Sequence, residues 1–123
     1  MRLSADAYRG LLGKRPSKYH NEKVNFRGET FDSKKEFEYY LILKDREKKG
    51  EITGLRRQVN FEIQPAFTDA RGNKHRAINY KADFVYETND NIIHVVDVKG
   101  MRTDVYRLKQ KLLAYKGVII EEV

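Results

Sequence analysis

The sequence contains no cysteine and no apolar run long enough to cross a bilayer. The lack of cysteine excludes disulfide bonds and any zinc or thiol chemistry that depends on cysteine, and it suits a cytosolic protein. The N-terminus also lacks the apolar segment of a signal peptide, so we expect a soluble protein that is not exported and acts in the cytoplasm. The three histidines, His20, His75 and His94, do not have the spacing of metal ligands.

What the sequence does contain is positive charge. Its 123 residues include 25 Lys and Arg against 18 Asp and Glu, which gives a net charge of +7. A polyanion is therefore the expected partner, with nucleic acid ahead of an anionic membrane surface. The length suits one domain with one core, which we expect over residues 21–123. Residues 1–20 form a basic arm with a possible short helix at Ser4–Leu12, and this arm is either solvated or bound to DNA.

Hydrophobic periodicity and turn residues predict the order of elements in the domain. Ser33 and Glu36 have the capping-box spacing that begins a helix, and Phe37, Tyr40 and Leu41 should face the core. In the second helix, the expected core stripe is Val105, Leu108, Leu112 and Tyr115. The predicted elements are a hairpin over residues 24–31 that turns at Arg27-Gly28, a helix from Asp32 to about Lys49, an antiparallel meander at about 59–67, 78–87 and 91–99, a helix from Thr103 or Asp104 to Lys116, and a final parallel strand over 118–123.

The meander contains the residues that point to chemistry. Asp83 follows Ala82 in the second strand, and the third strand ends Asp97-Val98-Lys99. Side chains alternate along a strand, so Asp97 and Lys99 should share one face. Carboxylates on adjacent strands can hold a hard cation beside an amine, and phosphodiester hydrolysis needs that combination.

Each of these residues also has a structural interpretation. Asp83 could pair with Lys81 or an arginine, Lys99 could pair with Asp97, and the capping box suffices to explain Glu36. Gln58 either approaches the site or ends a strand, and His94 is expected to be a packed histidine on the face opposite Asp97. Two acids on one face repel unless a cation or proton lies between them, which favours metal binding.

The ordered set of Glu36, Asp83, Asp97 and Lys99 resembles the PD-(D/E)XK nuclease superfamily over about residues 18–123. Ser33-Lys34-Lys35-Glu36, Gln58, Ala82-Asp83-Phe84 and Asp97-Val98-Lys99-Gly100 are similar to a small phage-encoded branch, itself similar to Holliday-junction resolvases and transposon end-cleaving nucleases. The resemblance implies an α/β fold with a restriction-endonuclease-like core, in which a mixed sheet of αβββαβ order is flanked by helices.

The same resemblance implies an Mg²⁺-dependent endodeoxyribonuclease, with Mn²⁺ as a substitute, that acts on branched DNA in the host-cell cytoplasm and away from membranes. Asp83, Asp97, the Val98 carbonyl and Glu36 would hold the metal, and Lys99 would act on the attacking water. Paired cuts across a junction imply a homodimer. The alternative function is a noncatalytic DNA-binding module of a phage recombination or packaging assembly. Residues expected at the DNA are Gln58, Arg102, Tyr106, Arg107, Lys109 and Lys111. Those that follow Asp97-Val98-Lys99 could instead form a solvated helix face.

Overall fold

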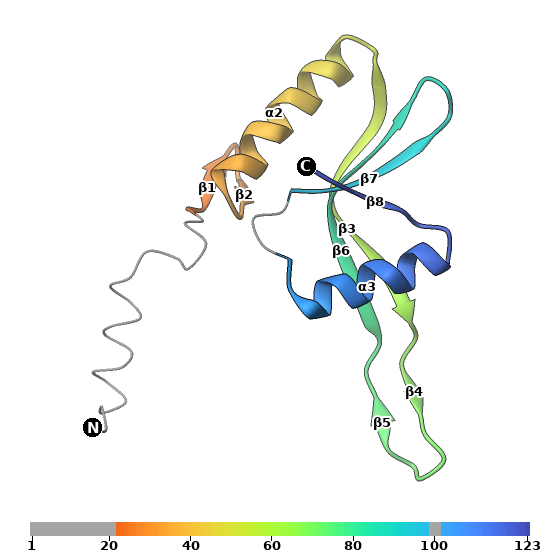
Figure 1. Ribbon diagram of the computed structural model, residues 1–123. Coiled ribbons are helices and arrows are strands. Elements are labelled where there is room, and N and C mark those ends of the chain that lie inside the picture. Colours follow the sequence, from red (N-terminus) through yellow and green to blue (C-terminus); the bar gives the residue numbers. More distant parts are fainter. Residues whose placement is uncertain (1–21, 99–101) are drawn as a thin grey trace, which may run out of the picture. The chain divides into compact units, whose positions relative to one another are not determined.

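The structure is a computed structural model that describes residues 22–98 and 102–123 (Figure 1). The chain divides into two compact units, one ending at Glu38 and the other spanning Tyr39–Val123, and each is described by itself. The predictions for the arm at residues 1–20 and for Lys99 fall outside the described residues.

Two helices and eight strands are present in the described ranges. In chain order they are β1 (Val24–Phe26), β2 (Glu29–Phe31), α2 (Lys34–Lys48), β3 (Ile52–Gln64), β4 (Phe67–Thr68), β5 (Lys74–His75), β6 (Ile78–Thr88), β7 (Ile93–Asp97), α3 (Asp104–Tyr115) and β8 (Ile120–Glu122).

The first unit contains the predicted hairpin, which is confirmed. Strands β1 and β2 are antiparallel, and both turn residues have positive φ, 50° at Arg27 and 81° at Gly28. This backbone conformation matches the right-handed twist of a two-residue hairpin. The rings of Phe26 and Phe31 lie 5.1 Å and 5.2 Å from the ring of Phe37, so the hairpin and the first turn of α2 share a small aromatic core.

Helix α2 begins and ends close to the predicted positions. The Ser33 hydroxyl accepts a hydrogen bond from the Glu36 backbone N–H at 3.1 Å, as a capping serine should. Gly50, with φ of 78°, follows the last turn. The prediction that Leu41 faces the core is wrong, because 43% of this residue is exposed while Leu43 is fully buried. The apolar positions allow either phase of the helix, and packing on the sheet selects the one that buries Leu43.

The second unit is built on a four-stranded mixed sheet of order β3-β6-β7-β8. Strands β3, β6 and β7 form the predicted antiparallel meander, and β8 is parallel to β7 as predicted. The mixed α/β class is therefore confirmed. Strand β3 begins at Ile52 rather than near Val59. The prediction missed the first part of this edge strand because a register shift between Thr53 and Arg56 disrupts the alternation of side chains there.

Two clusters of buried side chains form the core of this unit. Helix α3 contributes Tyr106 and Leu113 to one of them, and α2 contributes Leu43 to the other. The α3-side cluster comprises Ile63, Tyr80, Ala82, Val85, Val95, Tyr106, Leu113 and Ile120. The α2-side cluster comprises Leu43, Ile52, Phe84, Tyr86 and Val96, with Tyr39 and Tyr40 packed against it.

Helix α3 has the predicted limits but buries a different face from the one predicted. The Thr103 hydroxyl caps it by accepting from the Tyr106 N–H at 3.0 Å. Its buried residues are Tyr106 and Leu113, so the predicted core stripe is wrong. The members of that stripe are exposed: Val105, Leu108, Leu112 and Tyr115. Both sets recur at helical spacing, and the sheet selects the set whose tyrosine can bury its ring beside Tyr80. None of the described helices is long and apolar enough to span a membrane.

Candidate active site

The two predicted aspartates lie on adjacent strands of the sheet. Strands β6 and β7 are antiparallel, with Phe84 opposite Val96. Asp83 and Asp97 are the residues next to this pair, and Asp97 ends β7. The local sequence explains this position, because each acid borders an apolar run that the sheet buries. The fold therefore brings the two acids of the predicted site to neighbouring positions.

Asp97 is a buried carboxylate, with 2% of the residue exposed. The Tyr80 hydroxyl donates to Asp97 Oδ2 at 2.6 Å. The ring of Tyr80 lies 6.1 Å from the ring of Tyr106 in the α3-side cluster. Burial raises the pKa of both tyrosines, and the negative charge of Asp97 raises it further. Tyr80 therefore stays protonated at neutral pH and remains a hydrogen-bond donor to Asp97.

Asp83 is half-buried, and its hydrogen bonds link β6 to β3 and to the residue that follows β7. Its Oδ2 accepts from the Val98 backbone N–H at 2.8 Å, and its Oδ1 accepts from Gln58 Nε2 at 3.4 Å. Gln58 therefore approaches the site, which decides between its two interpretations. The bond to Val98 fixes the chain immediately after β7, at the residue that precedes Lys99.

The backbone around Asp83 is irregular. Gln58 has φ of 53°, which is uncommon for a residue with a side chain and costs about 1–2 kcal/mol. Tyr80 and Ala82 lie in the α3-side cluster but Phe84 lies in the α2-side cluster, although strict alternation would place all three on one face. The alternation of side chains between the two faces of the sheet is therefore interrupted at the level of Gln58 and Asp83.

The remaining predicted catalytic residues are not placed with this pair. Glu36 belongs to the first unit and is buried there, with 3% of the residue exposed. Lys99 lies outside the described residues. Their roles in a shared site stay predictions.

The donor chemistry of Asp83 and Asp97 fits a hard cation such as Mg²⁺, which prefers carboxylate and carbonyl oxygens. A carboxylate has about four acceptor positions, so an acid that accepts hydrogen bonds can in general also bind a metal ion. Among the described residues, no three His, Cys, Asp or Glu side chains gather in a metal-binding group. A cation held here would take its other ligands from the Val98 carbonyl, water or substrate.

The residues predicted to contact DNA differ in how exposed they are in the structure. Arg107 and Lys111 are exposed on α3, and Lys109 is half-buried. Tyr106 is not on the solvated face, because its ring fills the core beside the site. Arg102 forms an ion pair with Glu122 at 2.6 Å, so its charge is partly neutralised.

Sequence reasoning missed Tyr80 and Glu122. A buried tyrosine needs a partner for its hydroxyl, so a tyrosine three residues before Asp83 in an apolar strand was an available signal. Glu122 gave no signal, because only the parallel pairing of β8 brings it opposite Asp97. Its carboxylate accepts from Gln110 at 3.3 Å in addition to binding Arg102, which ties β8 to α3.

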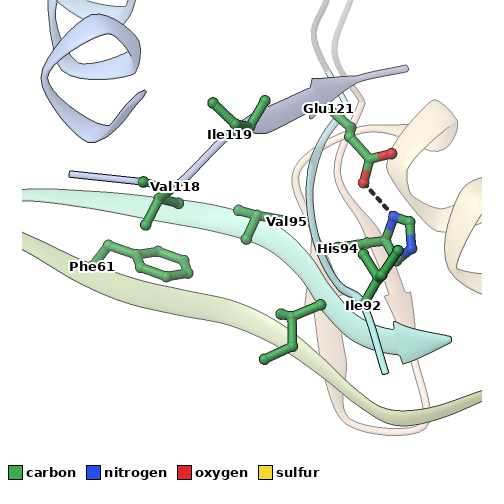
Figure 2. Close-up of a pocket in the computed structure, with 9 residues that line it drawn as sticks. Phe61, Ile92, His94, Val95, Val118, Ile119 and Glu121 are labelled. Atoms are coloured by element: carbon green, nitrogen blue, oxygen red, sulfur yellow. Dashed lines mark hydrogen bonds and ion pairs between the residues drawn. The ribbon is translucent and has the colours of Figure 1, made fainter. Parts of the chain in front are cut away.

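A separate cavity of about 590 Å³ lies between β7 and the α3–β8 connection (Figure 2). His94 Nδ1 and Glu121 Oε2 lie 2.8 Å apart there, and His94 also stacks on Tyr86. His94 is thus the packed histidine predicted for the face opposite Asp97. The rest of the lining is mainly apolar, with Ile92, Val95, Val118 and Ile119 around the opening. The cavity lacks the paired acids that hydrolysis of a phosphodiester would use.

The fold and the acid pair define a mixed α/β protein with a candidate cation site on its central strands. The chain matches the protein family of unknown function DUF1064 over residues 16–122, and it belongs to that family. The comparisons with curated proteins and with solved structures find no match.

Proposed function

We propose that this protein is an Mg²⁺-dependent endodeoxyribonuclease that acts on branched DNA. The observation that carries the proposal is the pair of Asp83 and Asp97 on adjacent strands, with the Asp97-Val98-Lys99 run at the end of β7. The resemblance of the ordered residues to the PD-(D/E)XK nucleases supports the same function. The net charge of +7 suits a polyanionic substrate.

In this proposal Asp83 and Asp97 hold the cation, together with the Val98 carbonyl and water. A bound Mg²⁺ would supply Lewis acidity and stabilise the charge that develops on the phosphate. Tyr80 is a positioning residue, because its hydroxyl holds Asp97 Oδ2 in one orientation. Gln58 does the same for Asp83 Oδ1.

Lys99 is the residue that would act on the water. It follows Val98 in the sequence, and the Val98 N–H donates a hydrogen bond to Asp83 Oδ2 at 2.8 Å. An amine beside the acids can orient the attacking water and offset negative charge in the transition state. Its expected contribution is to the rate of cleavage rather than to DNA affinity.

The exposed cations Arg107 and Lys111 on α3 would contact phosphates near the site, with Lys109 beside them. Such contacts give binding that depends on salt and little on base sequence. Two symmetric cuts across a junction need two sites, so the proposal includes a homodimer.

The experiment uses the full chain with linear, forked and four-way DNA. Mg²⁺ or Mn²⁺ should support cleavage, whereas Ca²⁺ should support binding with little cutting, because its looser coordination positions water poorly. The Asp83→Asn and Asp97→Asn variants are the matched controls for a contaminating nuclease. Full activity in chelator contradicts the proposal. Binding to every substrate without cleavage of any would favour the noncatalytic DNA-binding module instead.

A further inference from the structure

We infer that the β4–β5 hairpin is a rigid arm that binds the phosphate backbone of duplex DNA beside the candidate site. The inference rests on the proposed function, since it names the element that would hold one duplex arm of the substrate. The hairpin occupies the polar segment between the first two predicted strands, where sequence reasoning expected only a turn. It continues the long β3–β6 pair beyond the sheet (Figure 1).

The tip of the hairpin is fixed by its own hydrogen bonds. Asp69 Oδ1 accepts from the backbone N–H groups of Arg71 and Asn73, each at 2.9 Å. Asp69 Oδ2 lies 2.8 Å from His75 Nε2, and this contact holds the pKa of the Asp69 carboxyl below its usual range. Gly72, with φ of 86°, closes the turn. Asp69 therefore serves the turn itself.

The strands of the hairpin are joined by more than backbone hydrogen bonds. Phe67 lies opposite His75, and their rings stack with centroids 4.6 Å apart and an interplanar angle of 12°. Although Phe67 is 44% exposed, the stack covers one of its faces. The hairpin is thus ordered without burial in the core, which reduces the entropy lost when it binds a partner.

Three exposed cations lie on this hairpin and the residue after it: Arg71, Lys74 and Arg76. In the described part of the chain, none of their side chains forms an ion pair or side-chain hydrogen bond. Cations elsewhere in the second unit do have acidic partners, as Lys44 has Glu47 and Lys49 has Asp45. The hairpin therefore presents positive charge that its own fold does not neutralise, which suits contact with phosphates.

The dimensions suit a duplex. A two-stranded ribbon fits a DNA groove. Asp83 follows Arg76 by seven positions along the chain, a span of at most about 25 Å in an extended chain. At 3.4 Å per base pair this corresponds to about seven base pairs. Arg76 would therefore contact the duplex arm within about seven base pairs of the phosphate at the candidate site, and Lys74 and Arg71 lie further from Asp83 along the chain.

The test compares two full-length triple variants that each lose three positive charges. R71A/K74A/R76A removes the hairpin cations, and the control K34A/K35A/K48A removes three exposed lysines of α2. Binding to four-way DNA is titrated in Ca²⁺ across a range of salt concentrations. We expect the hairpin variant to bind about 10- to 100-fold more weakly. The slope of the logarithm of the binding constant against the logarithm of the salt concentration should become about 2 to 3 less steep. The control should change much less.

Further arms of the test fix the interpretation. Circular dichroism should show both variants folded, and the charge-preserving R71K/R76K should retain most of the affinity. Shortening every junction arm below about seven base pairs should remove the difference between the wild type and the hairpin variant. Equal losses in both triple variants, or no loss in the hairpin variant, would overturn the inference. A hairpin variant that loses affinity for duplex RNA but keeps its affinity for four-way DNA would also overturn the inference.

Cleavage by the wild type in Mg²⁺ separates this inference from the proposed function. If the wild type cuts DNA and the hairpin variant binds normally, the hairpin inference fails while the nuclease stands. If the wild type binds through the hairpin but cuts nothing, the nuclease fails while the hairpin inference stands.

Discussion

The middle of the β3–β6 ribbon and the β4–β5 hairpin that continues it differ in the exposure of their charged side chains. In the middle, Asp83 of β6 and the adjacent Asp97 of β7 are partly or fully buried and accept hydrogen bonds from Gln58, Val98 and Tyr80. At the end, the cations of the β4–β5 hairpin are exposed and have no acidic partner among the described residues. In the proposed function the acids hold the cation, whereas the exposed cations bind phosphates. The comparison predicts that changes in the middle affect rate and stability, and that changes at the end affect affinity.

The largest effect is expected from Asp97→Asn, which keeps the size of the side chain and removes the charge. Loss of a metal ligand removes several kcal/mol of transition-state stabilisation, so single-turnover cleavage should fall by about a thousandfold or more. Affinity for DNA in Ca²⁺ should stay within a few-fold of the wild type. A variant that binds weakly and cuts normally at saturation would reverse the proposed division of roles.

Lys99→Ala should come next, with cleavage reduced by about a hundredfold to a thousandfold, as for the loss of one electrostatic group at a reacting centre. DNA affinity should change little, because one phosphate contact is a small part of a many-contact interface. Arg107→Ala is the matched control, since it removes one exposed cation from α3. A Lys99→Ala protein that cuts at the wild-type rate would contradict the assignment.

Tyr80→Phe tests whether the buried hydroxyl supports Asp97. It removes a hydrogen bond to a charged group, and the free energy of unfolding should fall by about 1.5–3 kcal/mol. Tyr115→Phe is the control, because Tyr115 is 93% exposed on α3 and its substitution should change stability by less than about 0.5 kcal/mol. Urea denaturation measures both variants. Equal stability of the two would show that the Tyr80 hydroxyl contributes nothing to folding.

The smallest effect is expected at Gln58, where the positive φ can be separated from the hydrogen bond. Gln58→Gly and Gln58→Ala both lose the amide that contacts Asp83, but only glycine adopts this backbone conformation without strain. The glycine variant should therefore be the more stable of the two by about 1 kcal/mol. Denaturation of both variants measures the difference. A more stable alanine variant would mean that the backbone is not strained at this position.

The sequence by itself determined the elements whose signals are local. The Arg27-Gly28 turn, the Ser33 and Thr103 caps and the meander of three strands follow from turn residues, capping groups and alternation, which act within a few residues. The same signals placed Asp83 and Asp97 on neighbouring strands, because a hairpin connects them. That part of the candidate site was predicted before any tertiary contact was considered.

Only the tertiary structure decided which of two equivalent faces each helix buries. Val105 and Leu108 fit a core stripe as well as Tyr106 and Leu113 do, and the sheet chose the latter because the Tyr106 ring packs beside Tyr80. It also decided the hydrogen bonds of Gln58 and Tyr80 to the two acids, across 25 and 17 residues of sequence. Periodicity describes one element at a time, whereas these contacts depend on the twist and register of several strands.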